Sequence, residues 1–208
     1  IFASKQFQGS SDGGRYGDVI EEIDWSVGQV MKAIKDAGVD EKTLVVFTSD
    51  NGPWSMFEVH AGTAHPLRGE KGTSWEGGYR VPAIFRWPGR IKPGTVNGMA
   101  ANLDLYATFA TLTGGSQPTK LSGYMSKDLS PSLLQEKASP RTQWFYSMAG
   151  AIAFRSGNYK IHLSTRDRSS NPDTRAREPV TMYKQPLLFD LSRDIGEQTN
   201  LSDKHPDI

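Results

Sequence analysis

Apolar residues recur at every third or fourth position from Tyr16 to Ala37, which is the spacing of one face of an α-helix. Gly38 follows the last position of this pattern, and glycine suits the left-handed conformation that ends many helices. The pattern therefore predicts a helix over these residues with one apolar face, made by Val19, Ile20, Ile23, Val27, Val30, Met31 and Ile34.

The next segment, Thr43–Ser49, is a β-branched-rich run with the apolar residues Leu44, Val45, Val46 and Phe47 and without polar alternation. A run without polar alternation is typical of a strand that is covered on both faces, as in a parallel sheet. A second strand is predicted at Val81–Arg86. Because a helix, a short loop and a buried strand make half of a βαβ unit, we expect an α/β fold for this part of the chain.

A short helix is predicted from Asp104, as its N-terminal cap, to about Thr113, with Gly114 and Gly115 ending it. The segment Gly115–Pro140 is rich in Gly, Ser, Pro and Lys, which indicates a connection rather than a helix or a strand.

Four short strand patterns follow this connection and predict a small antiparallel sheet. Gly157 and Asn158 suit a turn between the second and third strands, and Ser164–Lys184 is a polar stretch that predicts a long loop. The predicted strands are Gln143–Met148, Ala151–Arg155, Tyr159–Leu163 and Leu187–Leu191.

Composition excludes several kinds of function. Hydrophobic residues make up 37% of the chain and charged residues 23%, as in an ordinary globular protein. A net charge of +1 argues against a nucleic-acid partner. No apolar stretch approaches the ~20 residues that a membrane span needs, so we expect none. The absence of cysteine excludes disulfides within these residues.

Asp50 and Asn51 directly follow the first predicted strand, at the end where open α/β sheets bind ligands. A carboxylate beside an amide oxygen suits a hard divalent cation such as calcium or magnesium. The alternative is a hairpin turn, because Asn-Gly is a strong turn signal. Pro53 weighs against that alternative, since proline makes a poor start to a second strand.

The stretch from Gly69 to Arg80 is rich in glycine and carries one lysine, Lys71. Glycine lets the backbone approach a ligand closely, and a lysine supplies three donors and a compact charge to a tetrahedral oxyanion. Thr73 and Glu76 have the spacing of a capping box, so a helical turn could begin at Thr73. The alternative is a surface loop with a solvated lysine.

Two histidines, His60 and His65, lie between the acidic turn and Lys71, where they could meet a substrate, although a loop histidine is more often solvated. His65 is the better candidate because it is nearer to Lys71 in sequence. Trp54 is an aromatic candidate for stacking on a substrate, as is Phe57; Trp75 fits the core equally well. His162 and His205 are expected to be structural and surface residues.

The ordered motifs TSDNG, PLRGEKGTSWEGGYRVPAIFRWPG and NLDLYATFATLTG resemble the calcium-dependent type I sulfatases of the alkaline phosphatase superfamily, nearest the arylsulfatase branch. The resemblance runs from GDVIEEIDWSVGQVMKAI to LLFDLSRDIGEQTNL, which is nearly the whole chain. It implies the C-terminal part of a mixed-sheet α/β sandwich over residues 1–125, followed by a small antiparallel-sheet C-terminal domain over residues 126–208.

The resemblance also implies roles for individual residues. Asp50 and Asn51 would bind Ca²⁺, with Mg²⁺ less suited, and Lys71 would contact the sulfate group of a sulfated small molecule or carbohydrate. Glu76, Arg80 and Pro82 would be structural, and the protein would be periplasmic, secreted or lysosomal.

One departure from the family pattern concerns the nucleophile, a formylglycine made within a Cys/Ser-x-Pro/Ala-x-Arg motif. That motif and the family's early Asp-Asp pair are absent here. We therefore expect these residues to be the C-terminal half of a larger enzyme, inactive without the N-terminal half. The alternatives are a phosphonate or phosphodiester hydrolase of the same superfamily and a non-catalytic fragment.

Overall fold

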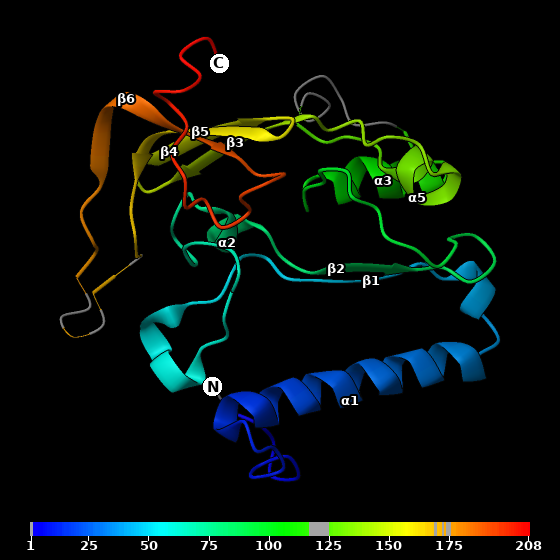
Figure 1. Ribbon diagram of the computed structural model, residues 1–208. Helices are drawn as coiled ribbons and strands as arrows, with labels where there is room; N and C mark the ends of the chain where they lie inside the picture. The colour runs from blue at the N-terminus through cyan, green and yellow to red at the C-terminus, as the bar shows by residue number, and fades with distance from the viewer. Residues whose placement is uncertain (1, 117–124, 169, 172, 174–175) are drawn as a thin grey trace.

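The computed structural model describes residues 2–116, 125–168, 170–171, 173 and 176–208. Its long first helix lies apart, beside a two-stranded ribbon, and a four-stranded sheet lies on the other side of that ribbon (Figure 1). In chain order the elements are α1 (Gly14–Asp36), η1 (Asp40–Lys42), β1 (Val45–Thr48), η2 (Ser55–His60), α2 (Glu76–Tyr79), β2 (Ala83–Arg86), α3 (Asp104–Leu112), α5 (Ser130–Gln135), β3 (Gln143–Met148), β4 (Ala151–Ser156), β5 (Tyr159–Thr165) and β6 (Thr181–Asp190).

The first helix confirms the periodicity prediction within two residues at its N-terminal end. Gly38 has a φ of 67° and donates its N–H to the Lys35 carbonyl (2.9 Å), so it ends the helix as predicted. Among the residues that the structure describes, no helix is apolar over a length that would cross a bilayer.

The strand β1 differs from the prediction of a parallel strand buried on both faces. It pairs with β2 in an antiparallel ribbon, in which Phe47 lies opposite Ile84. Phe47 is 39% exposed and Ile84 is 60% exposed. A groove of about 580 Å³ separates β1 from α1 and is lined mainly by apolar residues of both elements, including Val19, Ile23, Val30, Val45 and Phe47. The apolar pattern of β1 is thus not matched by burial within the described residues.

The antiparallel sheet is confirmed, in the strand order β3-β4-β5-β6. Gly157, at a φ of 57°, lies in the predicted turn between β4 and β5. The predicted loop Ser164–Lys184 is too long, because β5 extends to Thr165 and β6 begins at Thr181. Residues 169, 172 and 174–175 of that loop lie outside the described part of the chain.

The predicted connection Gly115–Pro140 contains a short helix, α5, which the prediction missed. Residues 117–124 of the connection lie outside the described residues, and the domain boundary after residue 125 stays a prediction. Asp104 is not the cap of α3 but its first residue, and it is fully buried. Its carboxylate pairs with the Arg141 guanidinium and accepts the Ala101 N–H (2.9 Å), so it anchors the connection to α3.

These 208 residues, expressed alone, are expected to self-associate. A two-stranded ribbon is marginal by itself, and an exposed apolar strand edge invites pairing with other chains. The measurement is sedimentation velocity over a concentration series, with Ile84→Lys as a matched variant. Ile84→Lys should reduce the association, and a monomeric wild-type chain with a reversible, cooperative melt would contradict this expectation.

Candidate active site

Backbone hydrogen bonds join the acidic turn, which carries Asp50 and Asn51, to the glycine-rich loop from Gly69 to Arg80. The Gly52 N–H donates to the Gly78 carbonyl (3.1 Å), and the Lys71 N–H donates to the Pro53 carbonyl (2.8 Å). A Cβ atom on Gly52 would lie 1.7 Å from the Gly77 carbonyl oxygen, so only glycine permits this approach. The structure therefore places Lys71 next to the chain segment that carries Asp50 and Asn51.

Asp50 and Asn51 follow β1 after one residue, as predicted, and the Asn51 amide donates to the Asp50 carboxylate. The hairpin alternative is wrong, because β1 pairs with β2 and the residues after the turn form η2. The Asn102 side chain donates to the Ser49 carbonyl (2.8 Å) and holds the base of the turn.

The side chains of Asp50 and Asn51 suit a hard cation, but they are too few to complete its ligand set. Calcium takes about six to eight oxygen ligands, and the two side chains supply a carboxylate and an amide oxygen. Within the described residues, no cluster of three or more His, Cys, Asp or Glu side chains could hold a metal ion. A cation at this turn would need further ligands, and the metal site stays a prediction.

The glycine-rich loop does not form the capping box that the spacing of Thr73 and Glu76 predicted. The helix α2 begins at Glu76, and the Thr73 hydroxyl donates to the Glu70 carbonyl (2.8 Å) instead of capping it. The cap comes from Glu197, whose carboxylate accepts the Glu76 N–H (2.7 Å). Gly77 is required here, since a Cβ atom on it would lie 2.5 Å from the Gly69 carbonyl oxygen. A distant residue thus replaces the local cap that the spacing suggested.

Lys71 is half-buried rather than fully solvated, and its Nζ atom lies 5.4 Å from the centre of the Trp54 ring. Trp54 in turn packs edge-on against Phe57, with ring centres 5.0 Å apart. The structure therefore brings the lysine together with the two aromatic residues of the intervening loop.

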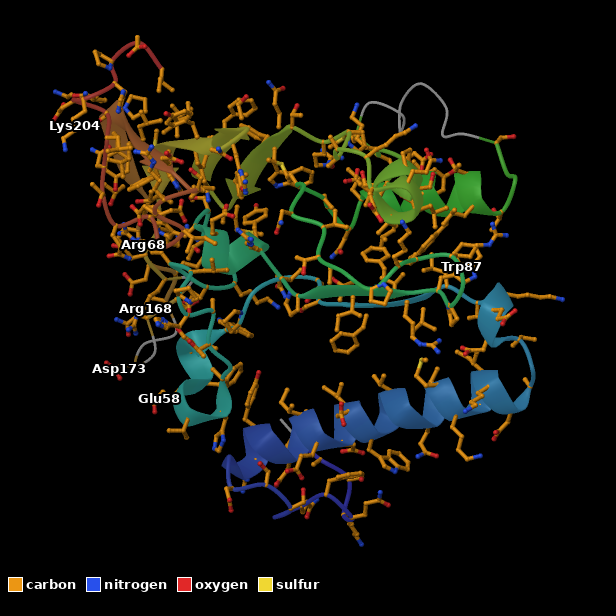
Figure 2. The ribbon with its side chains drawn as sticks, turned by 45° about the vertical axis from the view of Figure 1, so that its right-hand side comes forward. Glu58, Arg68, Trp87, Arg168, Asp173 and Lys204 are labelled. Atoms are coloured by element: carbon orange, nitrogen blue, oxygen red, sulfur yellow. The ribbon has the colours of Figure 1, made fainter. Side chains whose placement is uncertain are left out.

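The two loop histidines lie in different surroundings. His65 lines a pocket of about 480 Å³ together with Arg68, Arg168 and Gln198. Among the described residues, Glu70 and Pro53 also line this pocket, but Lys71 does not. The Nδ1 atom of His60 is buried and has no hydrogen-bond partner among the described residues. Figure 2 shows Arg68 and Arg168 on the same side of the molecule as Glu58 of η2.

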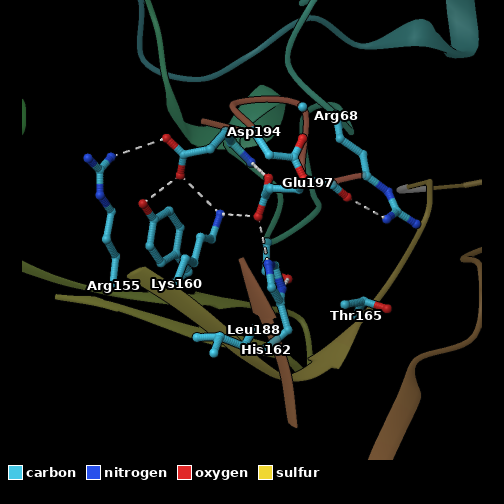
Figure 3. A network of polar contacts seen from close by, with 12 residues as sticks. Arg68, Arg155, Lys160, His162, Thr165, Leu188, Asp194 and Glu197 are labelled. Atoms are coloured by element: carbon cyan, nitrogen blue, oxygen red, sulfur yellow. Dashed lines mark hydrogen bonds and ion pairs between the residues drawn. The ribbon is translucent and has the colours of Figure 1, made fainter. Parts of the chain in front are cut away.

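A buried polar cluster behind the glycine-rich loop was not predicted. The Lys160 ammonium lies 3.0 Å from the Glu76 carboxylate and 3.1 Å from that of Glu197. The Nε2 atom of His162 lies 2.8 Å from Glu197, and the Tyr146 hydroxyl donates to Glu76 (2.7 Å). Figure 3 shows Lys160, His162 and Glu197 pointing toward one another, with Arg155 beyond. We call Glu76, Tyr146, Arg155, Lys160, His162 and Glu197 the buried cluster.

The protonation states in the buried cluster follow from its geometry. Burial raises the pKa of Glu76, but Lys160 and the hydrogen bond from Tyr146 outweigh this effect, so its pKa lies below the ordinary value. Burial lowers the pKa of His162 in spite of its hydrogen bond to Glu197. Burial and the neighbouring Glu76 carboxylate raise the pKa of Tyr146 well above its ordinary value. At neutral pH, Glu76 is therefore ionised and His162 is neutral.

A neutral His162 has one donor and one acceptor nitrogen. Because a carboxylate can only accept, Nε2–H donates to Glu197, and Nδ1 accepts from the Ser74 hydroxyl (3.2 Å). The prediction that His162 is structural is consistent with its complete burial. The signal that sequence reasoning missed is the alternation of Lys160 and His162 with apolar residues, which usually marks a solvated strand face.

The other residues assigned structural or surface roles differ from one another in exposure. Trp75 is fully buried and packs against Phe189, which favours the core interpretation over substrate stacking. Arg80 and Pro82 are exposed, so packing within the described residues gives no support for a structural role. His205 is exposed, as predicted.

Comparison with known proteins places the chain in a family. The sulfatase family model matches residues 3–116, more than half of the chain, and a model of the C-terminal region of aryl-sulfatase matches residues 138–208. Arylsulfatase A of Bos taurus is 43% identical over 219 residues, which cover 100% of this chain and 43% of that protein. Arylsulfatase A of Homo sapiens is 42% identical, over 96% of this chain and 41% of that protein.

A solved sulfatase from Pseudoalteromonas sp. superposes with a TM-score of 0.83 at 31% identity, over 94% of this chain and 40% of its own. This match confirms the α/β fold class that the sequence predicted, with the antiparallel C-terminal sheet. The chain spans less than half the length of the relatives that it matches. Both family models and these relatives agree, and the chain belongs to the sulfatase family.

Proposed function

We propose that these residues are part of a sulfuric ester hydrolase, to which they supply two metal ligands, Asp50 and Asn51, and a sulfate-contacting lysine, Lys71. The observation that carries the proposal is the pair of hydrogen bonds between the acidic turn and the glycine-rich loop, Gly52 to Gly78 and Lys71 to Pro53. These bonds join the segment that carries the Asp50 carboxylate to the segment that carries the Lys71 ammonium, which supports a shared site for a charged ester group.

The chemistry that these groups support is stabilisation of negative charge on the sulfate oxygens. A cation at Asp50 and Asn51, calcium in preference to magnesium, would polarise the sulfate when bound. The Lys71 ammonium would donate to a nonbridging oxygen as charge develops in the transition state. Lys71 is half-buried and its Nζ atom lies 5.4 Å from the centre of the Trp54 ring, and an ammonium in partly buried surroundings interacts with an anion more strongly than one in bulk water.

The remaining parts of the proposal concern the longer protein. We propose that the nucleophile is a formylglycine carried by an N-terminal half that these residues do not include. The substrate would be a sulfated carbohydrate or small molecule whose leaving group meets the loop containing Trp54, His60 and His65. A periplasmic, secreted or lysosomal location also remains part of the proposal.

The first test compares two polypeptides in an aryl sulfate assay. We expect the 208-residue chain alone to show no turnover above a mock preparation, because it contains no nucleophile motif. A longer chain that carries the family's N-terminal half should hydrolyse the ester. Turnover by the short chain, or none by a folded longer chain whose formylglycine is verified by mass spectrometry, would contradict the proposal.

Changes in the intervening loop should alter the ranking of substrates rather than the chemistry. His65→Ala and Trp54→Ala are expected to change kcat/KM by unequal factors for a small aryl sulfate and a sulfated sugar. The reason is that these side chains would meet the leaving group, which differs between the two substrates. Equal losses on both substrates would show that neither residue contacts the leaving group.

A further inference from the structure

Glu197 contacts both ends of the loop that carries Lys71. Its main-chain carbonyl accepts from the Arg68 guanidinium (3.1 Å), and its carboxylate accepts the Glu76 N–H (2.7 Å). Arg68 also stacks on the Trp75 ring, 3.7 Å from the ring centre. A residue that follows the last strand of the C-terminal sheet thus holds the loop at its beginning and at its end.

The backbone at Glu197 shows that its side chain matters at this position. Glu197 is fully buried and has a φ of 51°, in the left-handed region that glycine adopts most readily. A glutamate there must make contacts that outweigh the unfavourable backbone conformation. Its carboxylate makes three such contacts, with the Glu76 N–H, the Lys160 ammonium and His162.

The charges of the buried cluster depend on one another. Lys160 lies between the carboxylates of Glu76 and Glu197, and Arg155 lies 3.4 Å from Glu76. All of these side chains except that of Arg155 are almost completely buried. Removing one partner would leave a buried charge without compensation, so the geometry of the cluster is tightly defined.

Short hydrogen bonds connect the buried cluster to the loop that carries Lys71. The Gly77 N–H donates to the Arg68 carbonyl (2.7 Å) and closes the loop at its base. Ser74, in the middle of the loop, is tied to His162, which is tied to Glu197. Gly78, one residue after the closure, accepts from Gly52 of the acidic turn. The loop is therefore held between the C-terminal sheet and the acidic turn.

We propose that Glu197 and His162 are positioning residues, through which the C-terminal sheet fixes the place of Lys71 relative to the acidic turn. The inference rests on the proposed function, since Lys71 is the group whose position it concerns. Glu197 acts on Lys71 through the ends of the loop, and His162 acts through Glu197 and Ser74.

The test is a double-mutant cycle in the longer chain, with a small aryl sulfate as substrate. Glu197→Gln should lower kcat about tenfold, with a smaller change in KM. In the Lys71→Ala background the same substitution should have little further effect, because the group that it positions is gone. Additive losses would overturn the proposal.

A second readout, independent of activity, is hydrogen exchange of the backbone amides of residues 69–78. Glu197→Gln, and to a lesser degree Ser74→Ala, should speed exchange there. Leu188→Ala is the matched control: Leu188 is buried in β6 but lies on the opposite face of the sheet from Lys160 and His162. This control should lower the melting temperature without changing exchange in the loop or kcat below the melting transition.

Ser74→Ala keeps the buried charges intact, so it tests the proposal even if Glu197→Gln does not fold. Unchanged loop exchange in Ser74→Ala and in any folded Glu197→Gln, or equal effects in Leu188→Ala, would overturn the positioning role. An inactive wild-type enzyme with the expected exchange pattern would contradict the proposed function alone.

Discussion

Replacing Asp50 with alanine in the longer chain is expected to lower kcat/KM for sulfate esters by about 10³-fold or more. The substitution removes the charged ligand of the proposed cation, and a cation that polarises the ester contributes several kcal/mol to transition-state stabilisation. Each 1.4 kcal/mol corresponds to about a tenfold change in rate. Asn51→Ala should have a smaller effect, because it removes a neutral oxygen.

The measurement that checks the Asp50 prediction pairs steady-state kinetics with calcium titration by calorimetry. Asp50→Ala should weaken calcium binding more than Asn51→Ala does, in the same order as the losses in activity. Equal calcium affinity in wild type and Asp50→Ala would show that the turn after β1 is not a metal site.

Lys71→Ala is expected to lower kcat/KM by about 10²–10³-fold, the usual effect of removing one preorganised contact to a developing oxyanion. The loss should be the same for an aryl sulfate and a sulfated sugar, since the lysine would touch the sulfate group that all substrates share. This uniform loss is the opposite of the substrate-dependent effects expected for His65→Ala and Trp54→Ala.

The Lys71 prediction is checked by kcat/KM for both substrates in wild type and variant, with Lys92→Ala as the control. Lys92 is a lysine whose ion pair with Glu136 is solvent-exposed, so its removal should leave both rates unchanged. Loss of activity on one substrate with retention on the other would make Lys71 a leaving-group contact and would contradict its assignment.

The spacing of apolar residues and the positions of glycine correctly predicted the elements that depend on local sequence alone. The stripe from Val19 to Ile34 gave α1, and Gly38 and Gly157 lie in the left-handed conformations that their turns need. The adjacency of the acidic turn and Lys71 could be expected only from the resemblance, because it depends on hydrogen bonds between residues more than 15 positions apart.

The sequence could not predict the contacts made by distant polar residues. Glu197 replaces Thr73 as the cap of α2, and Asp104 pairs with Arg141 instead of capping α3. The alternating pattern around Lys160 is typical of a solvated strand face. Lys160 is nevertheless fully buried, because the glycine-rich loop covers that face of the sheet. In each case a local pattern gave way to a long-range ion pair or hydrogen bond, which a single sequence does not reveal.

The apolar run of β1 was interpreted as a strand covered on both faces, yet Phe47 is 39% exposed in the described residues. The exposure of Phe47 and the expected self-association of the chain have one physical origin, which is an apolar strand that the described residues do not cover. An apolar pattern reports the surroundings of a strand in the whole folded protein, and this chain spans 43% of the length of bovine arylsulfatase A.

The central claim, that the acidic turn and Lys71 serve sulfate ester hydrolysis, is tested most directly by a ratio of rates. The measurement is kcat/KM of the longer chain for an aryl sulfate, an aryl phosphonate and an aryl phosphodiester with the same leaving group, with and without calcium. We predict that the sulfate ester is the best substrate and that chelation of calcium abolishes its turnover. A higher kcat/KM for the phosphonate or the phosphodiester, or sulfate hydrolysis that is indifferent to calcium and to Asp50→Ala, would contradict the account.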